Sequence, residues 1–341
     1  MTPLASLALP PFRAANLLRS AHLMTVFGAR ARKESARLAA LSTYRVVRID
    51  DETRVRVRLT RPGAPRPTLV LVHGLVGDDS SPYMIGCAEK ALAAGLDVAR
   101  INLRNCGGTE ALTTSVYHGG ITADVAGTCR ALVADGVEQL VVAGFSLGGG
   151  IVLRWAGELG EDVPEWLAGV VAVSPAVDFE LAARACEAGR FARIYQRMFV
   201  ASLKEILARK HELFPERFPD PRGVPIRTLR EFDDRYTSRL SGFVGVEDYY
   251  AQASARPLLG RIRVPSAILA AQDDPLVPPA SFDEVRGGAL PAIRFIATEH
   301  GGHCGFVGAR PAILAGQRDL DRFWAESRVV QLTRSLLQGA C

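Results

Sequence analysis

Residues 139–159 read QLVVAGFSLGGGIVLRWAGEL, and this stretch decides the fold. Residues 139–145 are a nearly continuous apolar run, which is typical of a strand buried on both faces. Residues 147–159 have the composition and spacing of a helix. The intervening Gly144-Phe145-Ser146-Leu147-Gly148 therefore predicts a sharp strand-to-helix turn that lifts the Ser146 hydroxyl above the sheet. A glycine-rich turn without chemistry is the alternative interpretation.

Similar apolar runs recur on both sides of this stretch. They lie at residues 68–73, 97–103, 169–174, 266–271 and 293–298. Helices are expected at residues 82–95, 122–134, 280–287 and 311–337. Residues 44–50 and 54–60 instead alternate polar and apolar side chains, as a half-exposed antiparallel hairpin does. Strands that alternate with helices predict an α/β protein with a doubly wound, mostly parallel sheet, and the hairpin forms its antiparallel edge.

The alternation of strands and helices stops between Asp178 and Ser254. This segment is expected to be helical and is rich in arginine and aromatic residues. The segment is an insertion after one predicted core strand and before the next. It should therefore lie over the carboxyl ends of the strands, where open α/β sheets bind ligands. The expected organisation is an N-terminal clamp (1–43), a first core part (44–178), a helical cap (179–254) and a second core part (255–341).

Aromatic side chains of the cap are candidates for lining a channel for an acyl chain. The candidates are Phe191, Tyr195, Phe199, Phe232 and Tyr236. The alternative is that these rings only hold together a small core of the cap itself, without touching a substrate.

A serine hydroxyl is a weak nucleophile, so it needs a base that is itself oriented by an acid. With this kind of turn, the acid and then the base follow the serine along the chain. The strand at 266–271 leads to Asp273-Asp274, followed by Pro275 and Pro278. Asp274 is assigned as the acid, because the proline-rich turn should direct it into the site. Asp273 is its rival, and Asp178 is a reserve candidate.

The base is expected in the glycine-rich loop after the last predicted strand. Residues 299–306 read EHGGHCGF and contain two histidines. His303 has glycines on both sides, and we prefer it to His300 because it has more room to approach Ser146.

Two backbone N–H groups are expected to bind a developing oxyanion. One belongs to Leu147 at the start of the helix, and the other to Leu75, which follows His73-Gly74 after the first buried strand. The His73 ring itself is expected to bond to nearby backbone.

The 341 residues are 48% hydrophobic and 23% charged, which predicts a globular protein with a large core. The 41 basic residues are interspersed with 36 acidic ones, a pattern that disfavours a nucleic-acid partner. Six scattered cysteines lack the spacing of metal ligands, so we expect reduced thiols and no metal.

The N-terminus has neither the pattern of a signal peptide nor that of a membrane span. Its apolar start is ended by Pro10, Pro11 and Arg13. We therefore expect a cytoplasmic protein whose N-terminal segment packs on the core, and peripheral membrane contact through residues 4–27 is the alternative.

At these motifs the sequence resembles the α/β-hydrolase superfamily over roughly residues 44–337, and more narrowly its YheT-like branch of esterases and ABHD lipases. AHLMT at 21–25 is similar to an N-terminal HLQT-like motif of that branch. HGLVG at 73–77 resembles its oxyanion loop, and YHGG at 117–120 resembles its Y-H-x-G element. NLRNCGGT at 102–109 resembles its N-x-R-G-C-x-G loop, with Asn105 in the usual glycine position. The resemblance implies the α/β-hydrolase fold and esterase- or lipase-like action without a cofactor.

The sequence thus predicts a serine esterase that cleaves a small ester or an acylglycerol-like substrate through Ser146, His303 and Asp274. An acyltransferase that uses the same residues, with an alcohol in place of water, is the nearest alternative. A non-catalytic binding protein with this fold is a second alternative, and the presence of all three residues argues against it.

Overall fold

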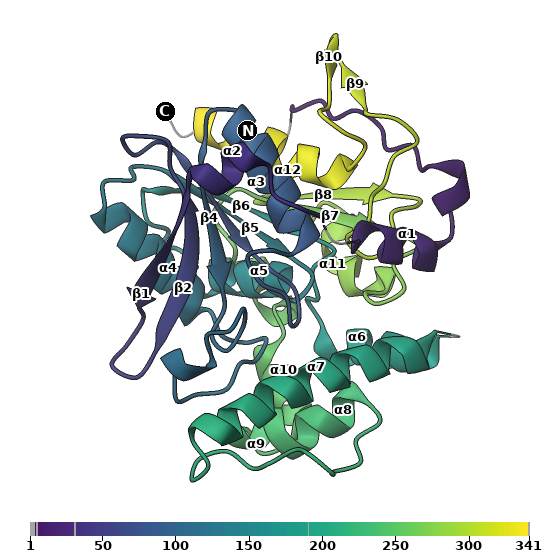
Figure 1. The fold of residues 1–341 in the computed structure, drawn as a ribbon. Coiled ribbons are helices and arrows are strands. Elements are labelled where there is room, and N and C mark those ends of the chain that lie inside the picture. The colour runs from purple at the N-terminus through teal and green to yellow at the C-terminus, as the bar shows by residue number, and fades with distance from the viewer. Residues whose placement is uncertain (1–3, 5, 31, 190, 340–341) are drawn as a thin grey trace.

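The computed structural model describes residue 4 and residues 6–30, 32–189 and 191–339. Its centre is an eight-stranded sheet with the strand order β1-β2-β4-β3-β5-β6-β7-β8 (Figure 1). β1 (Ser42–Arg48) and β2 (Arg54–Thr60) are the antiparallel edge. The parallel strands are β3 (Thr68–Val72), β4 (Asp97–Asn102), β5 (Leu140–Phe145), β6 (Leu167–Val173), β7 (Ser266–Ala271) and β8 (Ile293–Thr298). The predicted doubly wound, mostly parallel sheet is confirmed.

Helices cover both faces of the sheet. α3 (Pro82–Ala93) and α12 (Trp324–Gln338) pack on one face, and α4 (Ala123–Ala134) and α5 (Leu147–Leu159) pack on the other. β3, β5, β6 and β7 are buried along their whole length. Coverage on both sides is the reason why these strands are continuous apolar runs in the sequence.

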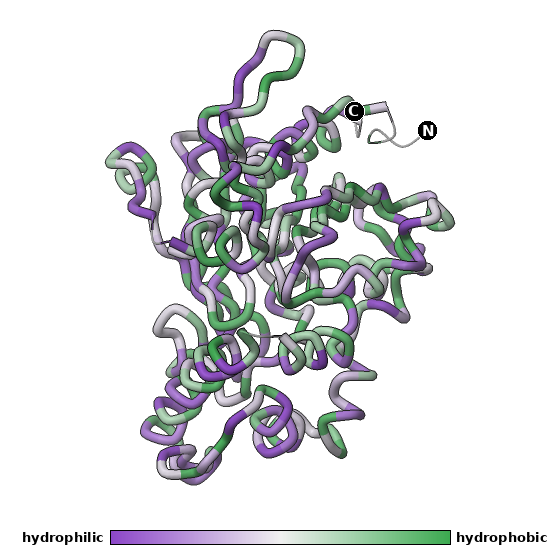
Figure 2. The backbone as a smooth tube through the Cα atoms, turned by 90° about the vertical axis from the view of Figure 1, so that its right-hand side faces the viewer, coloured by the Kyte–Doolittle hydropathy of each residue, from purple (hydrophilic) through white to green (hydrophobic). Residues whose placement is uncertain are grey.

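A separate group of helices follows β6 and lies at one end of the molecule, below the sheet in Figure 1. It comprises α6 (Phe179–Ala188), α7 (Ala192–Leu213), α8 (Leu229–Phe232), the π-helical turn η3 (Asp233–Thr237), α9 (Ser238–Leu240) and α10 (Val246–Ala253). Hydrophobic and hydrophilic stretches alternate along these helices in Figure 2, as expected of amphipathic helices. We call residues 179–253 the cap. The short helix η4 (Arg256–Arg261) leads from it to β7.

Three short helices precede the sheet: η1 (Asn16–Leu18), α1 (Ala21–Gly28) and α2 (Ala36–Ala40). α1 packs tightly on the loop that follows β8. A Cβ atom on Gly305 would lie 2.5 Å from the Met24 carbonyl oxygen, so only glycine fits there. The Val307 N–H also donates to the Met24 sulfur at 3.1 Å. The N-terminal segment is therefore tied directly to a loop at the carboxyl edge of the sheet.

One of the helix predictions is wrong. The helix expected at residues 280–287 is present as η5 (Pro279–Phe282), which runs directly into α11 (Asp283–Arg286). The expected helix at 311–337 begins only at Trp324 and is preceded by a hairpin of β9 (Ile313–Leu314) and β10 (Gln317–Arg318). Ala315 and Gly316 close this hairpin with φ angles of 47° and 79°. Positive φ at both turn residues suits a two-residue hairpin and ends any helix.

The described part of the chain contains five cysteines, and none of them forms a disulfide; Cys341 lies outside the described residues. Within the same residues, every helix is too short or too polar to cross a membrane.

Candidate active site

Ser146 occupies the turn between β5 and α5, with φ 53° and ψ −120°. Residues other than glycine rarely adopt a positive φ angle, so the surrounding contacts must hold the Ser146 backbone in this conformation. A Cβ atom on Gly144 would lie 2.2 Å from the Gly148 carbonyl oxygen, and one on Gly148 would lie 2.3 Å from that of His73. The Ser146 N–H donates to the Val173 carbonyl at 2.9 Å. The two glycines thus allow the close backbone approach on which the turn depends.

Three side chains lie in a hydrogen-bonded series at this turn. The His303 Nε2 atom is 2.7 Å from Ser146 Oγ. The His303 Nδ1 atom is 2.9 Å and 3.1 Å from the two carboxylate oxygens of Asp274. Because Nδ1 donates to the carboxylate, Nε2 is left as the acceptor that faces the serine hydroxyl. The Asp274 carboxylate is held by the N–H groups of Leu276 and Val277, each at 2.9 Å.

The electrostatics of the pair follow from its burial. Burial lowers the pKa of His303, but the charge of Asp274, its hydrogen bond to the ring and the neighbouring Cys304 together raise the pKa of His303 well above its usual value. The buried carboxylate therefore favours the imidazolium form that would arise if the ring accepted a proton.

The alternative candidates for the acid and the base, Asp273, Asp178 and His300, are not part of this hydrogen-bonded series. Asp273 accepts the Gly302 N–H at 2.9 Å and lies 3.3 Å from His300 Nδ1, so these two residues form a second pair that braces the loop. Asp178 accepts the Leu181 N–H at the start of α6 and forms an ion pair with Arg256. Neither carboxylate is brought to His303.

Leu75 and Leu147 both border the cavity beside Ser146. In the described part of the chain, neither backbone N–H donates to another protein group. The loop before Leu75 is fixed, because the Gly74 N–H donates to the Tyr83 hydroxyl at 2.9 Å. A Cβ atom on Gly74 would lie 3.1 Å from Ser146 Cβ, which brings this loop directly against the serine.

The His73 ring is fully buried and, within the described part of the chain, both of its nitrogens contact backbone groups, as predicted. Its Nδ1 lies 2.7 Å from the Gly74 carbonyl oxygen, and its Nε2 accepts the Leu103 N–H at 3.1 Å. Burial lowers the pKa of His73, so the ring is neutral and supports the Gly74 loop.

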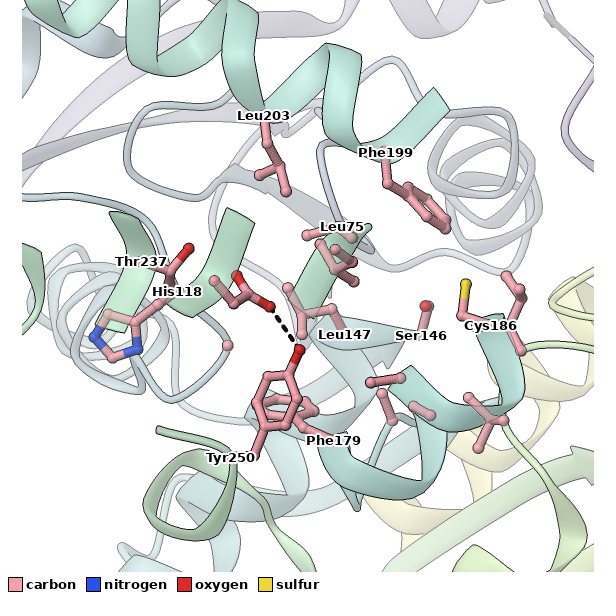
Figure 3. A pocket seen from close by; sticks show the side chains of 18 of the residues that line it. Leu75, His118, Ser146, Leu147, Phe179, Cys186, Phe199, Leu203, Thr237 and Tyr250 are labelled. Atoms are coloured by element: carbon pink, nitrogen blue, oxygen red, sulfur yellow. Dashed lines mark hydrogen bonds between the residues drawn. The ribbon is translucent and has the colours of Figure 1, made fainter. Parts of the chain in front are cut away.

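A cavity of about 100 Å³ opens beside Ser146 and His303, between the cap and the core. Figure 3 shows Phe199 and Leu203 reaching into it from one side, and Leu147 and Phe179 facing it from the other. Most of its wall is apolar, and an apolar wall suits a hydrocarbon chain.

Of the five cap aromatics predicted to line an acyl channel, Phe199 alone is among the described residues that border this cavity. Phe191 and Tyr195 pack beside Cys186 and Leu276, next to α1. Phe232 and Tyr236 belong to the small hydrophobic core of the cap and border a neighbouring hollow. For these four rings the prediction is corrected, because helical periodicity shows that a helix is amphipathic but not which neighbour its apolar face meets.

The cavity draws its other aromatic rings from the segments where cap and core meet. These are Tyr117 from the core and Phe179, Tyr249 and Tyr250 from the two ends of the cap. Of these four rings, only Tyr117 belongs to a motif that could be recognised in the sequence, YHGG.

α1 contributes a contact to the site that the sequence did not predict. The Thr25 hydroxyl accepts the His303 N–H at 2.9 Å and donates to the Ala21 carbonyl at 2.8 Å. In addition, His22 Nδ1 lies 3.1 Å from the hydroxyl of Tyr195 in the cap. The AHLMT motif thus touches both the histidine loop and the cap.

No three His, Cys, Asp or Glu side chains of the described residues are grouped as metal ligands.

The sequence profile of the α/β hydrolase fold family matches residues 67–309, and the chain belongs to this family. It is an esterase- and lipase-like member. It is 34% identical to "Putative esterase YheT" of Escherichia coli over 277 residues, which cover 80% of this chain and 78% of that protein. It is 25% identical to human phospholipase ABHD3 over 248 residues, or 71% of this chain, and spans only 59% of that longer protein.

Solved structures show the same fold at low sequence identity. The Pyrococcus furiosus esterase Pf2001 superposes with a TM-score of 0.60 at 12% identity, covering 98% of this chain and 100% of that one. A bacterial membrane phospholipase A has a TM-score of 0.53 at 18% identity, covering 95% of this chain and 93% of that one.

Proposed function

We propose that this protein is a serine esterase that cleaves carboxylic esters through an acyl-enzyme intermediate. The observation that carries the proposal is the series of hydrogen bonds from Ser146 to His303 to Asp274, beside an apolar cavity. The names of the relatives, an esterase and a phospholipase, support an ester substrate.

In the first step, Ser146 Oγ attacks the ester carbonyl carbon while His303 Nε2 takes its proton. The carbonyl oxygen becomes an oxyanion, for which the N–H groups of Leu75 and Leu147 are the available donors. Collapse of this intermediate expels the alcohol, which receives the proton from His303 and leaves the acyl group on Ser146.

In the second step, water attacks the acyl-enzyme and gives its proton to His303. A second tetrahedral intermediate collapses, releases the carboxylic acid and returns the proton to Ser146. Asp274 stays ionised in both steps and stabilises the imidazolium. The apolar cavity would hold the hydrocarbon part of the ester.

The proposal is tested by labelling with a fluorophosphonate, together with hydrolysis of simple esters. The native protein should be labelled with one equivalent, and Ser146→Ala should lose both labelling and hydrolysis while keeping its melting temperature. Ser80→Ala, which changes an exposed serine, is the matched control and should keep both activities. Full labelling of Ser146→Ala would contradict the proposal.

A further inference from the structure

Among the described residues that line the cavity beside Ser146, one carries a carboxylate, and the rest of the wall is mainly apolar. Asp233 is the first residue of the π-helical turn η3, is 7% exposed and borders the cavity. Its Oδ2 atom accepts a hydrogen bond from the Tyr250 hydroxyl at 2.9 Å. Figure 3 shows this bond as a dashed line at Tyr250, on the opposite side of Leu147 from Ser146. A molecule that reached from Ser146 past Leu147 would therefore meet a polar group.

Among the described residues, Asp233 forms no direct ion pair. The guanidinium of Arg230 forms its ion pairs with Glu180, Glu187 and Glu247, and its positive charge lowers the pKa of Asp233 only from beyond ion-pair distance. Burial raises the pKa of Asp233 to about 6, against hydrogen bonds from Thr237 and Tyr250 that lower it. At neutral pH the group is thus mostly ionised, although it lies in an apolar wall.

The hydrogen-bonding capacity of the carboxylate is only partly used. An ionised carboxylate offers about four acceptor positions, and Thr237 and Tyr250 fill two of them. Buried acceptors are normally satisfied, and Asp233 borders the cavity, so a molecule bound there could supply the missing donor.

The two adjacent carboxylates of the turn have different neighbours. Asp234 is not among the described residues that border the cavity, and its Oδ1 accepts the Val246 N–H at 3.3 Å. Asp234 therefore serves the cap structure, whereas Asp233 faces the space beside Ser146. π-Helical turns of this kind occur frequently at functional sites.

We propose that Asp233 and Tyr250 form a subsite that receives a hydroxyl group of the substrate, carried on the part of the ester that fills the cavity. This inference rests on the proposed esterase function and deepens it, because it names hydroxylated esters as the substrate class. The hydroxyl would donate to Asp233. A hydroxyl suits the site better than an ammonium group, because the surrounding apolar wall would strip a charged group of more of its hydration.

The test compares esters of the same chain length that end in a methyl, a hydroxyl or a trimethylammonium group, over a series of lengths. In the native protein, kcat/KM should favour the hydroxyl over the methyl ester at one length by about tenfold or more. Asp233→Leu should abolish or reverse that ratio, and Tyr250→Phe should reduce it. Asp234→Asn is the matched control, since it removes one charge from the same turn outside the cavity, and it should keep the native ratio.

Two measurements keep this inference separable from the esterase proposal. Equilibrium binding of the same esters to Ser146→Ala measures the preference without turnover, so absent hydrolysis with a retained preference overturns only the esterase proposal. Hydrolysis with equal ratios in native protein and Asp233→Leu overturns only the subsite, as does a stronger preference for trimethylammonium. If Asp233→Leu does not fold, Asp233→Ala decides, since it also removes both acceptor oxygens, and an unchanged hydroxyl ratio in that variant overturns the subsite.

Discussion

Asp273 and Asp274 are adjacent in the chain but hold different partners. Asp274 contacts the His303 ring, whereas Asp273 contacts His300 and the Gly302 backbone. Asp274→Asn should lower kcat by on the order of 10³–10⁴-fold, because the ring loses the partner that fixes its tautomer. Asp273→Asn should lower kcat far less, since it only weakens the contacts that Asp273 makes with the loop around His300 and Gly302. Steady-state kinetics of the two variants provide the check, and a larger loss for Asp273→Asn would reverse the assignment.

The pH profile is a second expectation at the scale of single residues. Only neutral His303 can accept the serine proton, and the Asp274 charge raises the pKa of His303 well above its usual value. kcat/KM should therefore rise with pH along a limb whose midpoint lies above the ordinary histidine pKa of about 6.5. In Asp274→Asn the residual activity should have its midpoint at lower pH, because the ring loses the Asp274 charge that raises its pKa against burial. An identical midpoint in both proteins would contradict this account.

At the scale of elements, the contact between α1 and the histidine loop makes Thr25 a positioning residue. Thr25→Val keeps the shape of the side chain but removes the acceptor for the His303 N–H. We expect kcat to fall by about tenfold, with little change in KM, because the ring is displaced while the cavity is intact. Thr25→Ser keeps the hydroxyl and should restore kcat. Equal loss in both variants would indicate that the methyl group, not the hydroxyl, matters.

At the scale of the whole molecule, the cap meets the core through some of its aromatic rings and folds on itself through others. Phe199 borders the cavity, whereas Phe232 is 4% exposed within the core of the cap. Phe199→Ala should change the ratio of kcat/KM between short and long esters by about tenfold with a small shift in melting temperature. Phe232→Ala should lower the free energy of unfolding by about 3–5 kcal/mol. Phe232→Ala should keep the native ratio of kcat/KM between short and long esters. A changed ratio in Phe232→Ala, with a large loss of stability in Phe199→Ala instead, would contradict these placements.

The sequence by itself determined the strand order along the chain, the turn at Ser146 and the residues that meet there. Apolar runs identify buried strands because burial on both faces excludes polar side chains. The glycines of GFSLG are required by backbone contacts of 2.2–2.3 Å for any added Cβ atom. Asp274 and His303 could be predicted because each lies in the loop that follows a strand, and parallel strands end at one edge of the sheet.

Tertiary structure alone decided which cap side chains face the cavity and which partner each loop residue holds. Amphipathic spacing marks an apolar face, but the cap helices could bury that face against each other or against the core. Asp233 and Asp234 are alike in sequence, and only the π-helical turn η3 decides which of them borders the cavity. The Thr25 contact joins residues 278 positions apart. Such contacts depend on the packing of whole elements, which local sequence patterns do not encode.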